Sequence, residues 1–246
     1  MIPDCDSHLD LSADLDNDNA VDKPEEACGV FGIYAPGQEV AKLTYFGLYA
    51  LQHRGQESAG IATFDGRELH EHRDMGLVAH VFNPEILEGL PGQIAIGHTR
   101  YSTTGSSHRA NAQPVIVETR LGKLALAHNG NLVNTAELRE YLVARGCELT
   151  TTIDSEMIAI AIQEEVNRGQ GWIEAAIAAC KLCKGAFSLT IATPDGIMAI
   201  RDPNGIRPLA LGIMPDHINH YVVASETCAL DIIGADYERE IKPGEL

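Results

Sequence analysis

The pattern of hydrophobic positions changes abruptly at residue 28. Residues 1–27 have no aromatic side chain and no sustained periodicity, so they cannot bury enough apolar surface to offset the entropy lost on ordering the backbone. From Cys28 to Tyr34 the chain runs as a short apolar segment that ends before Pro36 and Gly37, which is typical of a buried strand. We therefore expect a disordered leader, residues 1–27, and a folded domain, residues 28–246.

Beyond this first strand, helical and strand-like patterns are mixed along the chain. Asn134 followed by Glu137 is a capping-box pattern, which predicts a helix that ends near Arg145. Helices are also predicted at 39–52, 155–167 and 173–184, hairpins at 61–72 and 187–200, and strands at 94–99, 113–118, 122–128, 208–213 and 221–225. Short strands in hairpins, with helices grouped in a few places, predict an α+β fold in which sheet packs on sheet and helices lie outside.

Composition and charge narrow the class of protein. The chain has 246 residues, of which 45% are apolar, enough for one large core. Its formal net charge of -17 argues against nucleic acid as a partner, because phosphate binding needs clustered Lys and Arg. No apolar stretch approaches the roughly 20 residues that span a bilayer, and a signal-peptide pattern is absent. The sequence thus predicts a cytoplasmic protein that does not enter a membrane.

The charge is concentrated in the predicted leader, where nine acidic residues stand against one lysine. Cys28 lies at the junction between this leader and the first strand. A cysteine in a strand is ordinarily a small core residue. If the Ala27–Cys28 bond is cut, however, Cys28 acquires a free α-amino group beside its thiol. An α-amine with a pKa of about 8 can act as the base for that thiol, a pairing suited to amide hydrolysis.

The other cysteines and two histidines point to packing and solvation rather than to metal binding. The six cysteines are irregularly spaced, so we expect thiols and no disulfide framework. Cys180 and Cys183 lack the second ligand pair of a structural zinc site, and helix packing explains them better. His70 and His72 alternate along a predicted hairpin strand beside acids, which is typical of a solvated face. We expect no metal site in this chain.

Five motifs in order resemble those of class II glutamine amidotransferases, which are N-terminal-nucleophile hydrolases. They are CGVFG at 28–32, LQHRGQESAG at 51–60, GHTRYSTTG at 97–105, AHNGNL at 127–132 and IDSE at 153–156. Residues 52–56, 129–134 and 202–208 are most similar to the branch that uses phosphoribosyl pyrophosphate in purine synthesis. The resemblance extends from Cys28 to the last residue, and it implies a four-layer αββα sandwich with Cys28 as the nucleophile.

The resemblance also assigns roles to residues that have simpler local explanations. Asn129 and Gly130 would form the oxyanion hole, although an Asn-Gly pair after an apolar strand also suits a tight turn. Arg100 would bind the α-carboxylate of glutamine, but most arginines form surface ion pairs. Asp154 would bind the α-ammonium group, yet it precedes a predicted helix and could equally be its N-cap.

Two further assignments concern the edges of the site. Arg54 would lie near the nucleophile and help to close a loop over it. The polar segment 100–113, which contains Thr103, has the composition of a mobile lid, and Thr103 is assigned to substrate binding within it.

The implied reaction is hydrolysis of glutamine to glutamate and ammonia. Family members carry a second, phosphoribosyltransferase domain that uses the ammonia. No part of this sequence matches that domain, so we expect the chain to be a fragment. Mg²⁺, and in some members an iron–sulfur cluster, are expected only in the full-length enzyme, which we expect to be a homo-oligomer. Two alternatives remain: the same domain of another class II amidotransferase, or a binding module of this fold that never exposes Cys28.

Overall fold

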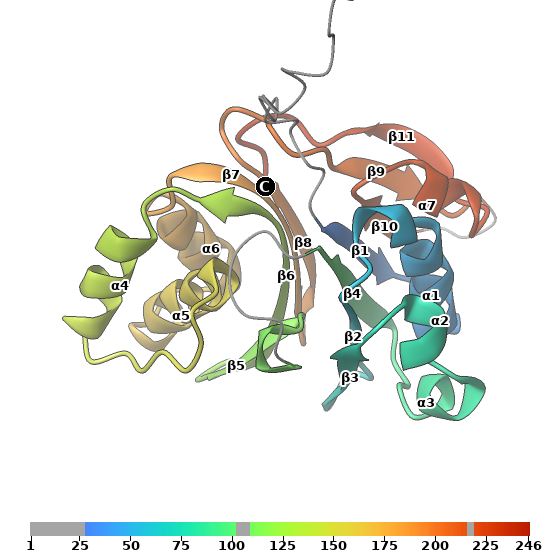
Figure 1. Ribbon diagram of the computed structural model, residues 1–246, viewed down its shortest axis with the longest axis horizontal. Coiled ribbons are helices and arrows are strands. Elements are labelled where there is room, and N and C mark those ends of the chain that lie inside the picture. The colour runs from blue at the N-terminus through green and yellow to red at the C-terminus, as the bar shows by residue number, and fades with distance from the viewer. Residues whose placement is uncertain (1–27, 102–108, 216–218) are drawn as a thin grey trace, which may run out of the picture.

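Two antiparallel sheets pack face to face in the computed structural model, and helices cover both outer faces (Figure 1). The structure describes residues 28–101, 109–215 and 219–246. The arrangement is a four-layer αββα sandwich, which confirms the predicted α+β class and the layering that the resemblance implied. The predicted leader, residues 1–27, and Thr103 lie outside the described residues.

The larger sheet places β1 at its centre, between β10 and β4. Over the described residues its strands, in spatial order, are β11 (Asp236–Glu240), β9 (Ala210–Ile213), β10 (Tyr221–Ala224), β1 (Gly29–Tyr34), β4 (Ile94–Arg100), β2 (Ser58–Phe64) and β3 (Leu69–Met75). Its outer face is covered by α1 (Val40–Ala50), α2 (Val78–Val81), α3 (Pro84–Glu88) and α7 (Cys228–Asp231). The single-turn helix η1 (Gln52–Arg54) follows α1. Because β1 is the central strand, the segment that begins at Cys28 enters the middle of the sheet.

The smaller sheet carries the other group of helices on its outer face (Figure 1). In the described part of the chain its strands, in order, are β5 (Val115–Thr119), β6 (Gly122–Leu132), β7 (Gly185–Thr193) and β8 (Gly196–Arg201). The covering helices are α4 (Thr135–Val143), α5 (Asp154–Asn167) and α6 (Trp172–Cys180). A short turn of helix, η2 (Arg109–Asn111), precedes β5. β6 is the longest strand, and it extends past the end of β5.

Successive side chains along each strand point to opposite faces of the sheet, so the core divides into layers. Val30 of β1, Ile96 of β4 and Ala127 of β6 belong to one cluster between the two sheets. Phe31 of β1 packs under the helices of the larger sheet, and Leu126 of β6 packs under those of the smaller one. Even positions of β1 and β4 and odd positions of β6 thus face the space between the sheets.

Several elements differ from the sequence-based expectations. The predicted capping box at Asn134 is wrong, because α4 has no side-chain cap. The Asn134 amide instead donates to Leu182 O at 2.9 Å and accepts from Lys184 N at 2.8 Å. The helix expected at 173–184 ends at Cys180, since residues 181–184 turn the chain into β7. The short helices α2, α3 and α7 and the strand β11 were not anticipated.

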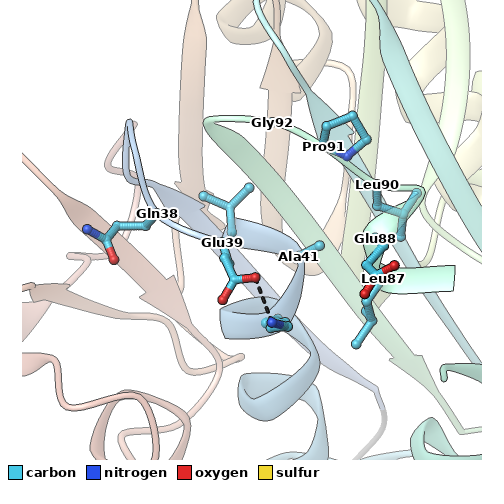
Figure 2. A pocket seen from close by; sticks show the side chains of 10 residues that line it. Gln38, Glu39, Ala41, Leu87, Glu88, Leu90, Pro91 and Gly92 are labelled. Carbon is cyan, nitrogen blue, oxygen red and sulfur yellow. Dashed lines mark hydrogen bonds and ion pairs between the residues drawn. The ribbon is translucent and has the colours of Figure 1, made fainter. Parts of the chain in front are cut away.

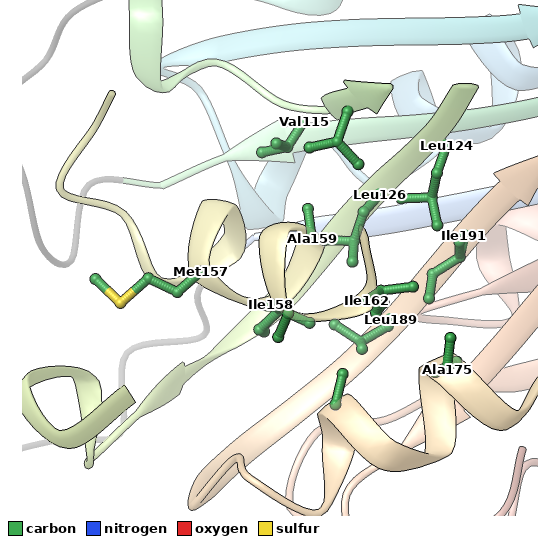
Figure 3. Close-up of a cluster of buried hydrophobic side chains, with 14 of the residues drawn as sticks. Val115, Leu124, Leu126, Met157, Ile158, Ala159, Ile162, Ala175, Leu189 and Ile191 are labelled. Atoms are coloured by element: carbon green, nitrogen blue, oxygen red, sulfur yellow. The ribbon is translucent and has the colours of Figure 1, made fainter. Parts of the chain in front are cut away.

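Truncating Leu189 in β7 to alanine should destabilise the fold. Leu189 is fully buried between the smaller sheet and its helices (Figure 3), so Leu189→Ala should lower the free energy of unfolding by about 3 kcal/mol. Urea denaturation measures this loss. Val133→Ala, at a side chain that is 78% exposed, should change it by less than about 0.5 kcal/mol. Equal effects of the two substitutions would contradict this account of the core.

Candidate active site

Cys28 lies immediately before β1 and is buried, with 8% of its surface exposed. Its thiol donates to the Tyr101 carbonyl oxygen across 3.9 Å. Burial raises the pKa of this thiol, and the nearby Arg100 guanidinium offsets that rise only in part. A buried thiol of this kind does not ionise unaided at neutral pH, so a reaction at Cys28 requires a base.

Three charged side chains act on the Cys28 thiol, and they are the three that the family resemblance selected. Arg100 and Arg54 favour the thiolate, whereas Asp154 disfavours it. Arg100 ends β4, Arg54 ends the short helix η1, and Asp154 begins α5. The fold therefore gathers residues from three separate elements around one sulfur atom.

Arg54 lies closest to the backbone of the nucleophile. Its Nε donates to Cys28 O at 2.8 Å, and the residue is only 1% exposed. Its Nη1 forms an ion pair with Glu226, a residue that the sequence analysis did not select. The next residue, Gly55, packs directly on β4: a Cβ there would lie 2.6 Å from Thr99 C and 2.7 Å from Arg100 N. Glycine at this position thus lets η1 approach the strand and brings Arg54 to Cys28.

Arg100 is buried at the end of β4, with 4% of its surface exposed. Its Nη1 lies 3.3 Å from Oε1 of Glu57, and Glu57 N donates to Arg100 O at 3.0 Å. The simpler explanation, a surface ion pair, is therefore wrong in one respect, because Arg100 itself is buried and the Glu57 side chain is only 14% exposed. A planar guanidinium in such a position can bind a carboxylate through two hydrogen bonds.

Asn129 lies within β6, not in a turn: the strand continues through Gly130 to Leu132, and the tight-turn alternative is wrong. As an odd position of β6, Asn129 faces the space between the sheets, the same space that Arg100 faces from β4. The side chain is completely buried. Neither its Nδ2 nor its Oδ1 has a hydrogen-bond partner among the described residues, which is rare for a buried amide.

Gly130 has a φ of +154°, and a Cβ at this position would lie 2.0 Å from Ala186 O. β6 extends beyond the end of β5, and the Gly130 N–H points to the side of β6 that β5 leaves unpaired there. On that edge His128 N donates to Gln113 Oε1 at 2.8 Å, and Leu132 N donates to Asp154 Oδ2 at 2.9 Å. The alternation of N–H directions along a strand places the Gly130 N–H between these two donors.

Asp154 is the first residue of α5, and it does not cap that helix, so the N-cap alternative is wrong. Its carboxylate accepts from Leu132 N and lies 3.4 Å from His128 Nδ1. Burial acts to raise the pKa of Asp154, but His128 and the Leu132 N–H outweigh it, and the pKa is lowered. Asp154 therefore carries a negative charge at neutral pH next to Cys28. His128, a motif residue to which the sequence assigned no role, holds it in place.

The remaining signals lie outside this site. Cys180 and Cys183 pack at the end of α6 against the helical core, and burial raises the pKa of each thiol to about 12. Within the described residues, no three His, Cys, Asp or Glu side chains gather so as to hold a metal ion. The expectation of Mg²⁺ and an iron–sulfur cluster in a longer protein stays a prediction.

A surface hollow of about 310 Å³ lies between the first turn of α1, where Glu39 and Lys42 pair, and the segment Leu87–Gly92 (Figure 2). None of the residues around Cys28 lines it. The mutual geometry of the site residues, and not this hollow, therefore marks the candidate active site.

In the part of the chain that the structure describes, none of the helices has the length and apolar character needed to cross a bilayer.

Comparison with known proteins agrees with the geometry. Residues 98–231, more than half of the chain, match the glutamine amidotransferase domain family. An amidophosphoribosyltransferase from a Synechocystis species is 67% identical over 226 residues, which cover 92% of this chain and 46% of that protein. The corresponding protein of Synechococcus elongatus is 64% identical over 240 residues, 96% of this chain and 49% of that protein. The chain thus spans about half the length of these relatives.

Solved structures give the same result for the fold. The glutamine phosphoribosylpyrophosphate amidotransferase of B. subtilis, complexed with ADP and GMP, superposes with a TM-score of 0.80 at 42% identity, over 88% of this chain and 46% of that one. A structure described as the allosteric regulatory enzyme of purine biosynthesis gives a TM-score of 0.81, also at 42% identity, over 88% of this chain and 45% of that one. The chain therefore belongs to the glutamine amidotransferase family.

Proposed function

We propose that this domain hydrolyses glutamine to glutamate and ammonia, with Cys28 as the nucleophile. The observation that carries the proposal is the convergence of Arg100, Asp154 and Arg54 on the buried Cys28 thiol. Arg100 and Asp154 present opposite charges, as an amino acid requires: the guanidinium suits an α-carboxylate and the carboxylate suits an α-ammonium group. Thr103 belongs to the same substrate-binding proposal.

The first half of the reaction is attack on the side-chain amide. The thiol transfers its proton to the α-amine of Cys28, which is free once residues 1–27 are removed, and sulfur bonds to the amide carbon. The Asn129 Nδ2 and the Gly130 N–H then donate to the oxyanion. Collapse of this intermediate breaks the C–N bond, and the proton held on the α-amine leaves with ammonia.

The second half regenerates the thiol. A water molecule, deprotonated by the same α-amine, attacks the thioester, and the oxyanion again binds to Asn129 and Gly130. Collapse of this intermediate breaks the C–S bond, releases glutamate and returns the proton to sulfur. In this scheme one residue supplies both nucleophile and base, so the predicted leader, residues 1–27, blocks catalysis until it is removed.

We further propose that the whole protein uses the ammonia to form phosphoribosylamine from phosphoribosyl pyrophosphate. The names and lengths of the relatives support this step, because about half of each relative lies outside the match to this chain. The partner would be a phosphoribosyltransferase domain that binds Mg²⁺, within a homo-oligomer in the cytoplasm. An iron–sulfur cluster, which some family members hold, would belong to that longer protein.

Intact mass spectrometry before and after reaction with an electrophilic glutamine analogue tests the proposal. We expect a chain that begins at Cys28 and carries one adduct at that residue. Excess glutamine should protect Cys28 from the analogue, because both bind through Arg100 and Asp154. Cys180 and Cys183 should stay unlabelled, since burial holds the pKa of each of these thiols far above neutrality. An uncut and unlabelled protein would refute the proposed function.

A further inference from the structure

Ser225 and Glu226 follow β10, and Ser225 contacts Val30 near the start of β1. Ser225 Oγ accepts from Val30 N at 3.0 Å, and Ser225 N donates to Val30 O at 3.0 Å. Val30 lies two positions after the nucleophile, and Ser225 thus binds both polar groups of its backbone. Ser225 is 1% exposed, so these bonds are shielded from water.

Glu226 contacts the nucleophile through Arg54. One carboxylate oxygen of Glu226 pairs with Arg54 Nη1, and the other lies 3.0 Å from His53 Nε2. Arg54 then donates from Nε to Cys28 O at 2.8 Å. A continuous chain of contacts therefore runs from Glu226, through the Arg54 side chain, to the carbonyl of the residue that bears the reactive thiol.

The position of the Arg54 guanidinium depends on the negative charge of the Glu226 carboxylate. The Arg54 side chain is 1% exposed, and a buried cation needs a partner charge. Burial acts to raise the pKa of Glu226, but the hydrogen bond and charge of Arg54, together with His53, lower it. Glu226 is therefore ionised at neutral pH and supplies the negative charge that holds the Arg54 guanidinium against Cys28.

We propose that Glu226 is a positioning residue for glutamine hydrolysis, acting through Arg54 on Cys28. This inference rests on the proposed function, in which Cys28 attacks the amide. Fixing the Cys28 carbonyl fixes the direction in which its side chain leaves the backbone, and hence the path of the sulfur toward the substrate. A displacement of about 1 Å in such a group can cost on the order of 100-fold in rate.

Steady-state kinetics of glutamine hydrolysis by the full-length protein test the role. Glu226→Ala should lower kcat by roughly 10- to 100-fold and leave KM within about twofold, because Glu226 does not contact glutamine. Glu226→Gln keeps an oxygen that accepts from Arg54 and should lose less. Glu137→Ala, at a 68% exposed carboxylate paired with Lys184, should leave both constants unchanged.

A double-mutant cycle with Arg54→Met separates positioning from a general loss of stability. If Glu226 acts through Arg54, adding Glu226→Ala to Arg54→Met should lower kcat by less than about twofold more, since coupled residues are not additive. Additive losses, or an unchanged kcat in folded Glu226→Gln and Glu226→Ala, would overturn the positioning role. Labelling of wild-type Cys28 by the glutamine analogue keeps the two proposals distinct. Its absence refutes the proposed function, whereas labelling with an unchanged kcat in the variants refutes only the role of Glu226.

Discussion

Replacing Cys28 with serine is expected to abolish glutamine hydrolysis and to leave the fold intact. The serine hydroxyl can still donate to Tyr101 O, and the side chain is slightly smaller, so the site should fold as before. An alcohol is far less acidic than a thiol, so the α-amine in this site, with a pKa of about 8, should activate a serine hydroxyl much less effectively than it activates the thiol. We expect kcat to fall by on the order of 10⁴ or more, as for loss of other catalytic nucleophiles.

The matched control is Cys180→Ala, which removes a thiol that packs at the end of α6 and lies outside the site. Its turnover should equal that of the wild type. Glutamine turnover by Cys28→Ser above a tenth of the wild-type rate, after removal of residues 1–27, would rule out Cys28 as the nucleophile.

The pH dependence of kcat provides a second check on the same residue. Burial raises the pKa of the thiol, so the thiol is neutral at pH 7 and needs the free α-amine as its base. The amine acts only when unprotonated, and activity should therefore fall as the pH drops below about 8. A protein that retains Ala27 has an amide nitrogen instead of this amine, and it should be inactive across the whole range.

Asn129 and Gly130 adopt a conformation that their local sequence does not predict. Their local sequence favoured a tight turn, yet the chain remains extended because β6 pairs with β7 along its length, with Asn129 opposite Ser188 and Gly130 opposite Phe187. Those partners lie more than fifty residues away. Only the resemblance to a family, and no local pattern, assigned these two residues to the site.

Glu226 and β11 were missed for the same physical reason. Arg54 and Glu226 are separated by 172 positions, and no spacing rule connects them. β11 consists of five exposed residues, four of them charged, and its pairing with β9 defines it as an edge strand. The central strand β1, by contrast, is buried on both faces, and its apolar run was sufficient to predict it. Sequence patterns thus predicted the elements that build the core, whereas contacts between distant segments determined the site.

Asn129→Ala is expected to lower kcat by on the order of 100- to 1000-fold, the usual cost of removing one oxyanion-hole donor. The amide acts only when charge develops on the carbonyl oxygen, so KM for glutamine should change little. The same substitution should not destabilise the protein. Both polar atoms of Asn129 are buried without a partner among the described residues, and such groups cost about 1–3 kcal/mol in the folded state.

Asn134→Ala should give the opposite result, and it is the control for this prediction. The Asn134 amide is also buried, but it bonds to Leu182 O and Lys184 N. Its loss should lower the free energy of unfolding by about 1–3 kcal/mol and leave kcat of the folded protein unchanged. Urea denaturation and steady-state kinetics of the two variants measure both effects. A stability loss without a kcat loss in Asn129→Ala would show that its amide serves the fold, and Asn129 would then have no place in the oxyanion hole.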